Sequence, residues 1–139
     1  MSNQKLATAL FDGFSARDLS AWYASLADDF VASYPSARMG LNREQARAYN
    51  EPFLTAFSDL HVTYQDSATN GDVTMTKWTG TGTHDGPLAL SPTQVAPPTG
   101  KKGNVSGVVI VQTKNGKIVR EETYWNLLEL LTQLGLMPG

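Results

Sequence analysis

The sequence predicts a single α+β domain, because apolar residues repeat mostly at helical spacing in its first half and at strand spacing in its second half. In the second half, the dipeptides Asn70-Gly71 and Asn115-Gly116 each separate two strand-like segments, which is typical of tight hairpin turns. Helices followed by an antiparallel meander indicate an α+β architecture. A chain of 139 residues can bury one core but is too short for two ordinary domains, so we expect one domain over residues 1–139.

The first half is predicted to hold three helices and one short strand. Ser15 and Asp18 have the spacing of a capping box at the start of the second helix, and Asn42 and Gln45 have this spacing at the start of the third. Pro52 lies inside the third helix, where it predicts a kink or a break. The helices are expected at residues 4–14, 15–26 and 43–57, and the strand at residues 29–34.

Four strands and a closing helix are predicted in the second half. The strands are expected at residues 60–66, 72–84, 104–113 and 117–125, and the helix at residues 127–134. Between the second and third of these strands, the segment 85–104 is rich in proline and shows no periodicity. This pattern predicts a long loop of the kind that often covers a binding site.

Composition argues against several classes of function. The net charge of -2 is near neutral and no basic cluster exceeds Lys101-Lys102, which argues against a nucleic-acid partner. The chain has no cysteine, so disulfides, thiol catalysis and cysteine-ligated metals are excluded. The first residues lack the pattern of a signal peptide, and no run approaches the roughly twenty apolar residues of a membrane span. We therefore expect a cytoplasmic protein without a membrane partner.

Four segments of the chain carry a family resemblance: "KWTGTGTHDGPL", "PPTGKKGNVSGVVIV", "NGKIVREETYW" and "LLTQLGLMP". In order and spacing they resemble the SnoaL-like polyketide cyclases of the nuclear-transport-factor-two-like superfamily, over a region from about Leu19 to the C-terminus. The resemblance implies a cone-shaped barrel, in which a curved, mainly antiparallel sheet and the N-terminal helices packed on it enclose an apolar pocket. It also implies a homodimer or higher homo-oligomer formed through the open sheet face.

The resemblance further implies a cofactor-free reaction on a small hydrophobic molecule. The best-known members of the family close a ring by intramolecular aldol condensation, and a carboxylate near the end of the last strand removes a proton from carbon. That position is Asn126 in this chain. An amide donates and accepts hydrogen bonds but does not act as a general base near neutral pH. Asn126 is therefore predicted to be a catalytic hydrogen-bonding partner, and another group must transfer the proton.

His84 is the predicted proton-transfer group. Histidine is the side chain whose ordinary pKa lies closest to neutrality, and the resemblance implies a histidine at the pocket in this position. The alternative is a structural histidine at the end of a strand, bonded to a loop carbonyl.

Four aromatic residues, Tyr34, Trp78, Tyr124 and Trp125, are predicted to line the pocket and to stack on a planar carbonyl compound. The alternative is that these rings only fill the core. Which of Tyr124 and Trp125 faces inward depends on strand parity, which a β-bulge would reverse. Gly80 and Gly82, in the strand predicted at 72–84, favour such a bulge.

Carboxylates form a further set of candidates. Asp66, at the end of a strand, is predicted to contact the substrate, and Glu122 shares strand parity with Asn126. The alternative for both is an ordinary solvated acid, and residues 121–123 look partly exposed. No spacing of histidine and carboxylate indicates a zinc site, so we expect neither a metal nor a cofactor.

Two functions of different classes remain open. The first is an enzyme of the cofactor-free aldol cyclase type, or a related lyase or isomerase, acting on a hydrophobic and aromatic carbonyl compound. The second is a ligand-binding protein of the same fold that has lost catalysis, with Asn126 marking the loss. A dimerisation module without a ligand is a third possibility, and it predicts a core filled with side chains.

Overall fold

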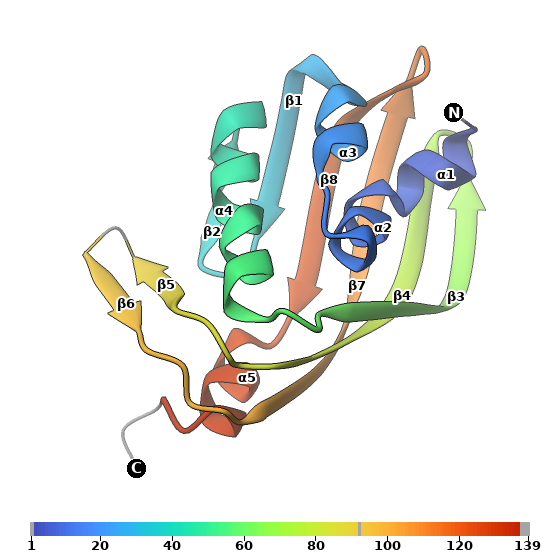
Figure 1. The fold of residues 1–139 in the computed structure, drawn as a ribbon. Helices are drawn as coiled ribbons and strands as arrows, with labels where there is room; N and C mark the ends of the chain where they lie inside the picture. Colours follow the sequence, from blue (N-terminus) through green and yellow to red (C-terminus); the bar gives the residue numbers. More distant parts are fainter. Residues whose placement is uncertain (1, 92, 137–139) are drawn as a thin grey trace.

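A computed structural model of the chain describes residues 2–91 and 93–136, and shows helices covering one face of a curved sheet (Figure 1). The helices are α1 (Asn3–Ala7), α2 (Ala9–Ala16), α3 (Ser20–Ala24), α4 (Arg43–Ala56) and α5 (Leu127–Gln133). The strands are β1 (Leu26–Tyr34), β2 (Ala37–Leu41), β3 (His61–Asn70), β4 (Val73–Thr83), β5 (Leu88–Ser91), β6 (Gln94–Ala96), β7 (Lys102–Lys114) and β8 (Lys117–Trp125). None of the described helices is long and apolar enough to cross a membrane.

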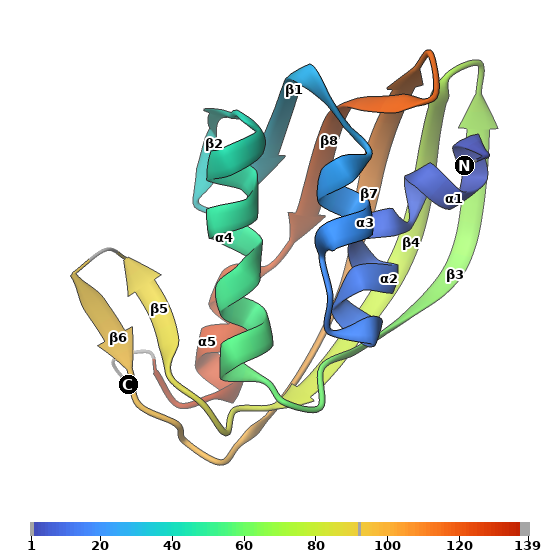
Figure 2. The same cartoon turned by 45° about the horizontal axis from the view of Figure 1, so that its top comes forward.

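The main sheet of the described chain has the strand order β2-β1-β8-β7-β4-β3. Strands β3, β4, β7 and β8 form the predicted antiparallel meander. The β7–β8 hairpin turns at the predicted Asn115-Gly116 pair, whereas the β3–β4 hairpin turns at Gly71-Asp72, one residue beyond the start of the predicted pair. Strand β1 pairs with β8 in parallel, so the sheet is mixed but mainly antiparallel. The α+β prediction and the expected curved sheet with helices on one face are therefore confirmed (Figure 2).

The core lies between this sheet and helices α1 to α4. Trp22 of α3 and Phe30 of β1 are among its most buried side chains. Apolar burial of this kind is the main favourable term in folding. A smaller cluster at the other end of the sheet joins Leu130 and Leu134 of α5 to Phe57 and the β5–β6 hairpin.

The helices differ from the prediction in three places. The helix predicted at 4–14 is divided into α1 and α2 at Thr8. Ser15 does not cap a helix, because its hydroxyl accepts a hydrogen bond from the Val62 backbone N–H. Asp18 instead accepts a hydrogen bond from the Ser20 N–H at the start of α3. Of the two outcomes predicted at Pro52, a kink or a break, the break is wrong, since α4 runs through Pro52 as one helix. The predicted capping box of α4 is present.

Two short pieces of sheet were not predicted. Strand β2 pairs with β1 at the edge of the main sheet. The predicted loop at 85–104 contains the β5–β6 hairpin, whose Leu88 and Ala96 are buried against the ends of α4 and α5. The hairpin lies beside α4 in Figures 1 and 2.

Candidate functional site

An apolar cavity of about 80 Å³ lies between the sheet and helices α2 and α4, with Leu130 of α5 at one end. Its aromatic lining includes Phe11, Tyr34, Phe53, Phe57, Trp78 and Trp125. The cavity is smaller than the roughly 300–1,000 Å³ of typical ligand pockets, so a ring-bearing ligand must displace some of these side chains.

Three of the four aromatic residues predicted for the pocket line this cavity. Tyr34 stacks on Tyr49, and Trp78 and Trp125 meet edge to face. Tyr124 lies on the outer face of the sheet instead, where its side chain is 45% exposed and its hydroxyl donates to Glu122. A ligand in the cavity would therefore not touch Tyr124.

A β-bulge at Val119 explains why Trp125 rather than Tyr124 faces inward. Thr113 of β7 is opposite Ile118 and Gln112 is opposite Arg120, which leaves Val119 as an extra residue in β8. An extra residue reverses which side chains face the core, because strand side chains alternate between the two faces. The expected bulge near the glycines of β4 is not present, because β4 pairs with β7 without a shift.

The bulge also brings two polar residues inward that looked exposed from the sequence. Glu121 is 1% exposed and Thr123 is 3% exposed, so the expectation of a solvated 121–123 segment is wrong at both positions. Glu122 faces outward between them. Asp66 is also exposed, in an irregularity of strand β3 between Tyr64 and Ser67, and it does not reach the cavity.

Glu121 forms a buried pair with Tyr34 that sequence reasoning missed. The phenol Oη lies 2.7 Å from Glu121 Oε2. Burial raises the pKa of Glu121 to about 7, although Tyr34 and the neighbouring Trp22 indole lower it. The Trp22 N–H is buried near this carboxyl and has no hydrogen-bond partner among the described residues. Burial also raises the pKa of the Tyr34 phenol, and the Glu121 carboxyl raises it further.

Thr123 and Asn50 add polar groups to the same end of the cavity, and both line it. The Thr123 hydroxyl is buried without a hydrogen-bond partner in the described part of the chain. Because Ser33 pairs with Glu122, the next residues along the two parallel strands place Tyr34 beside Thr123. The cavity is thus apolar along most of its wall and polar at this end.

Asn126 lies outside the cavity, on the exposed surface at the start of α5. Its Oδ1 accepts a hydrogen bond of 3.0 Å from the Glu129 backbone N–H, which makes it the N-cap of the helix. Asparagine is among the preferred residues at this position, because its side chain satisfies a backbone donor that the helix leaves free.

His84 is completely buried but is not among the residues that line the cavity. Its Nδ1 lies 3.0 Å from the Thr99 hydroxyl and accepts a hydrogen bond of 3.3 Å from the Thr99 backbone N–H. Nε2 has no partner among the described residues. The ring packs on Phe57 at a centroid distance of 5.7 Å, and Phe57 lines the cavity. The cavity therefore does not bring His84 and Asn126 together.

A family model described as SnoaL-like polyketide cyclase matches residues 4–134. The chain belongs to this family. Among solved structures, AclR from Streptomyces galilaeus is 23% identical with a TM-score of 0.82, and the match covers 99% of this chain and 87% of AclR. IdmH from Streptomyces antibioticus is 23% identical with a TM-score of 0.79, over 97% of this chain and 99% of IdmH. A search of the curated proteins gives no match to this chain.

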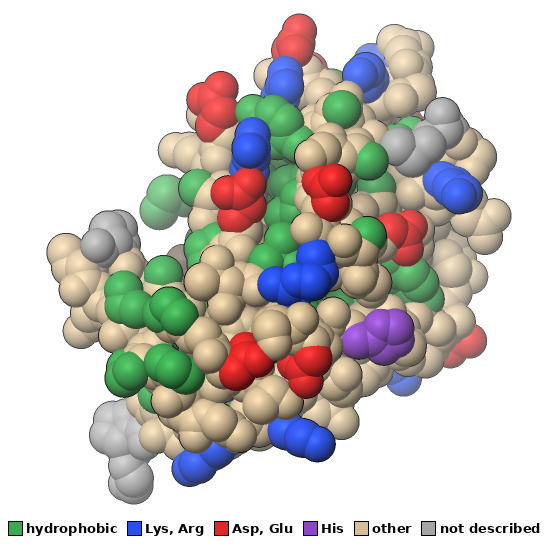
Figure 3. Space-filling model, in the orientation of Figure 1, with side chains coloured by type: hydrophobic (Ala, Val, Ile, Leu, Met, Phe, Trp, Pro, Cys, Tyr) green, Lys and Arg blue, Asp and Glu red, His purple; other side chains and the backbone are tan. Residues whose placement is uncertain are grey.

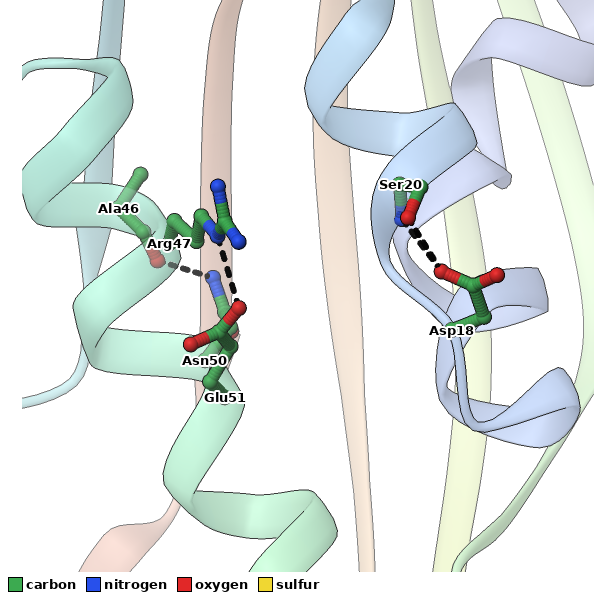
Figure 4. A network of polar contacts seen from close by, with 6 residues as sticks. All are labelled: Asp18, Ser20, Ala46, Arg47, Asn50 and Glu51. Carbon is green, nitrogen blue, oxygen red and sulfur yellow. Dashed lines mark hydrogen bonds and ion pairs between the residues drawn. The ribbon is translucent and has the colours of Figure 1, made fainter.

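This SnoaL-like chain has a second groove of about 450 Å³ between α3 and α4. In Figure 3, acidic and basic side chains surround hydrophobic ones on this helical face of the molecule. Figure 4 shows the groove's polar residues bonded within each side: Asp18 accepts from Ser20, and Arg47 pairs with Glu51. These groups are already paired and highly solvated, so the groove has fewer features of a site than the cavity.

Within residues 2–91 and 93–136, no group of three or more histidine, aspartate or glutamate side chains is arranged to hold a metal ion. The buried Glu121 has no second carboxylate or histidine within hydrogen-bond reach. In this SnoaL-like fold, the cavity end formed by Tyr34, Thr123 and Asn50 is therefore the strongest candidate site for proton-transfer chemistry.

Proposed function

We propose that this protein is a cofactor-free, cyclase-type enzyme that binds a hydrophobic carbonyl compound in the cavity between the sheet and helices α2 and α4. Membership of the SnoaL-like polyketide cyclase family supports the reaction class. The observation that carries the proposal is an aromatic cavity with its polar groups gathered at one end. Such a wall suits a planar apolar body, and the polar end suits its oxygen atom.

An aldol ring closure matches these surroundings chemically. A base removes a proton from the carbon next to a carbonyl, the enolate carbon attacks a second carbonyl in the same molecule, and the resulting alkoxide takes up a proton. The proton lost from carbon is balanced by the proton gained by oxygen, so the step involves no net oxidation or reduction. Hydrogen-bond donors in a dry cavity stabilise the enolate far better than water does.

The first half of this reaction is testable without the natural substrate. We expect the protein to accelerate exchange of the α-hydrogens of 2-tetralone, a bicyclic hydrophobic ketone, for deuterium in D₂O. Mass spectrometry measures the exchange, and we expect an acceleration of about 10² or more over buffer, the lower range for general base catalysis.

A matched pair of variants on β7 separates the cavity from the rest of the surface. Val105 lines the cavity, and Val108 lies on the outer face of the same strand with 37% of its side chain exposed. Val105→Phe should fill the cavity and return exchange to the buffer rate, whereas Val108→Phe should leave it unchanged. Binding of 2-tetralone in calorimetry without any exchange would instead support the ligand-binding protein, and neither binding nor exchange would contradict the proposal.

A further inference from the structure

We propose that Tyr34 is the catalytic residue of the cavity and that Glu121 acts through it. The two residues then form a proton relay, and this inference rests on the proposed function. Tyr34 lines the cavity and Glu121 lies behind it, with 2.7 Å between the phenol Oη and the carboxyl Oε2. Both side chains are 1% exposed, so bulk water does not compete for this hydrogen bond.

The surroundings of Glu121 contain no compensating cation. Ala32 on β1 and Val111 on β7 flank it across the sheet. The titratable groups close enough to interact with it are phenols: Tyr34, and Tyr64 of β3, whose pKa is raised by burial, by Asp12 and, to a smaller extent, by Glu121. No ion pair to Glu121 is present among the described residues. A buried acid is normally paired with a cation, whereas the hydrogen bond to this one among the described residues comes from the Tyr34 phenol.

The absence of a cation lets Glu121 exchange its proton near neutral pH. Burial raises the pKa of its carboxyl to about 7, so both protonation states are populated there. A group with its pKa near the operating pH is best suited both to accept and to return a proton. Tyr34 alone lacks this property, because burial and the carboxyl raise the pKa of its phenol.

The relay balances protons and charge over the reaction. In the first step, Tyr34 Oη accepts the proton from the substrate α-carbon while its own proton passes to ionised Glu121. The substrate becomes an enolate and Glu121 becomes neutral, so the cavity keeps one negative charge. After the carbon–carbon bond forms, Tyr34 gives a proton to the alkoxide and regains one from Glu121. Both residues then return to their starting states.

Thr123 is the second observation that points to a ligand. Its buried hydroxyl has no partner in the described chain, lines the cavity and lies two residues after Glu121 on the same face of β8. An unpaired buried hydroxyl is costly, so a ligand oxygen that bonded to it would remove the penalty. Placed beside Tyr34, this hydroxyl would hold the substrate oxygen at the relay.

The test measures 2-tetralone deuterium exchange against pH in the full chain. Tyr34→Phe keeps the ring that stacks on Tyr49 and should lower exchange at least 100-fold. In the wild-type protein, the exchange rate should rise with pH with a midpoint near pH 7. Glu121→Gln keeps the shape of the side chain, and it should lower the exchange rate and remove this rise. Glu121→Asp should restore part of the rise. If Glu121 has only a structural role, the exchange rate that remains in Glu121→Gln should still rise with pH at the wild-type midpoint.

Two controls are matched to these changes. Tyr64→Phe removes a half-buried phenol that donates to the Thr8 carbonyl, and Glu122→Gln removes the neighbouring acid on the outer face. Neither should change exchange more than about threefold, well below the 10²-fold scale of a general base. If wild-type exchanges and Tyr34→Phe exchanges equally fast, the relay is overturned while the proposed function stands.

If the wild-type protein does not exchange 2-tetralone, nuclear magnetic resonance of a ¹³C-labelled Glu121 carboxyl decides the question. The relay predicts that bound 2-tetralone shifts the titration midpoint of Glu121 in the wild-type protein and not in Tyr34→Phe. An unchanged midpoint, or the same shift in both proteins, would overturn it.

Discussion

Asn126 accepts a hydrogen bond from the Glu129 backbone N–H at 3.0 Å, which places the amide at the N-cap of α5 and turns it away from the cavity. Because an N-cap satisfies a donor that the helix leaves free, Asn126→Ala should lower the free energy of unfolding by about 1 kcal/mol. Asn126→Asp keeps the hydrogen-bond acceptor and should change the free energy of unfolding little. Urea unfolding followed by circular dichroism measures both variants.

The same variants test whether Asn126 takes part in catalysis. Both should exchange 2-tetralone at the wild-type rate, since neither change alters the cavity lining. A folded Asn126→Ala protein that lost exchange would show that the amide acts on the reaction.

His84 lies behind Phe57 with its Nδ1 bonded to Thr99, and two substitutions separate its ring nitrogens. Asparagine places an acceptor near the position of Nδ1, and glutamine places a donor near that of Nε2. If the histidine is structural, His84→Asn should retain more stability than His84→Gln, and both should keep exchange within about threefold of wild-type while folded. A loss of exchange of 100-fold or more in both folded variants would instead support His84 as the proton-transfer group, because neither amide acts as a general base.

The buried carboxyl of Glu121 predicts a pH-dependent stability. Its folded pKa, about 7, lies above the ordinary value of 4.5, so its contribution is complete below pH 4.5 and is lost as pH rises through 7. We compare the free energy of unfolding of the wild-type protein with that of Glu121→Gln. The wild-type value minus the variant value should fall by about 3 kcal/mol over this pH range, since each pKa unit corresponds to about 1.4 kcal/mol. Urea unfolding of both proteins from pH 4 to pH 8 measures the difference, and a constant difference would contradict the burial argument.

Thr123 and Thr76 offer a comparison of two buried threonines. The Thr123 hydroxyl has no partner among the described residues, whereas that of Thr76 lies 3.1 Å from the Ser67 hydroxyl. Thr76→Val should therefore destabilise the protein by about 1 kcal/mol, while Thr123→Val should be neutral or stabilising.

Binding distinguishes the two threonines in the opposite sense. Thr123→Val should weaken 2-tetralone binding about fivefold or more, the equivalent of one hydrogen bond, and Thr76→Val should leave it unchanged. Equal affinities in calorimetry would show that the Thr123 hydroxyl does not hold the ligand.

Local sequence signals were sufficient to predict the elements that fix this fold. The Asn-Gly pairs at 70–71 and 115–116 require residues that tolerate turn conformations, and Gly71, Asn115 and Gly116 have positive φ angles in the structure. The capping box of Asn42 and Gln45 depends only on residues three apart, so it also was predictable. Strand β2 was missed because Ala37–Leu41 shows no apolar alternation and is defined by its pairing with β1.

The candidate site was less predictable, because it depends on a bulge and on distant contacts. Counting parity from Ile118 places 122, 124 and 126 on the inner face, and the extra residue at Val119 reverses that result. Glu121 then meets Tyr34, which lies 87 residues earlier in the chain. A local pattern carries no information on such a pair, so an acidic Glu-Glu-Thr segment looked solvated.

A crystal structure with 2-tetralone bound would test the central claim most directly. The account predicts the ring in the cavity between α4 and the sheet, with the ketone oxygen within hydrogen-bond distance of the Thr123 hydroxyl and the α-carbon about 3–3.5 Å from Tyr34 Oη, the separation of atoms poised to react. A ketone oxygen directed at His84 Nε2 past a displaced Phe57, or a ligand bound outside the cavity, would contradict it.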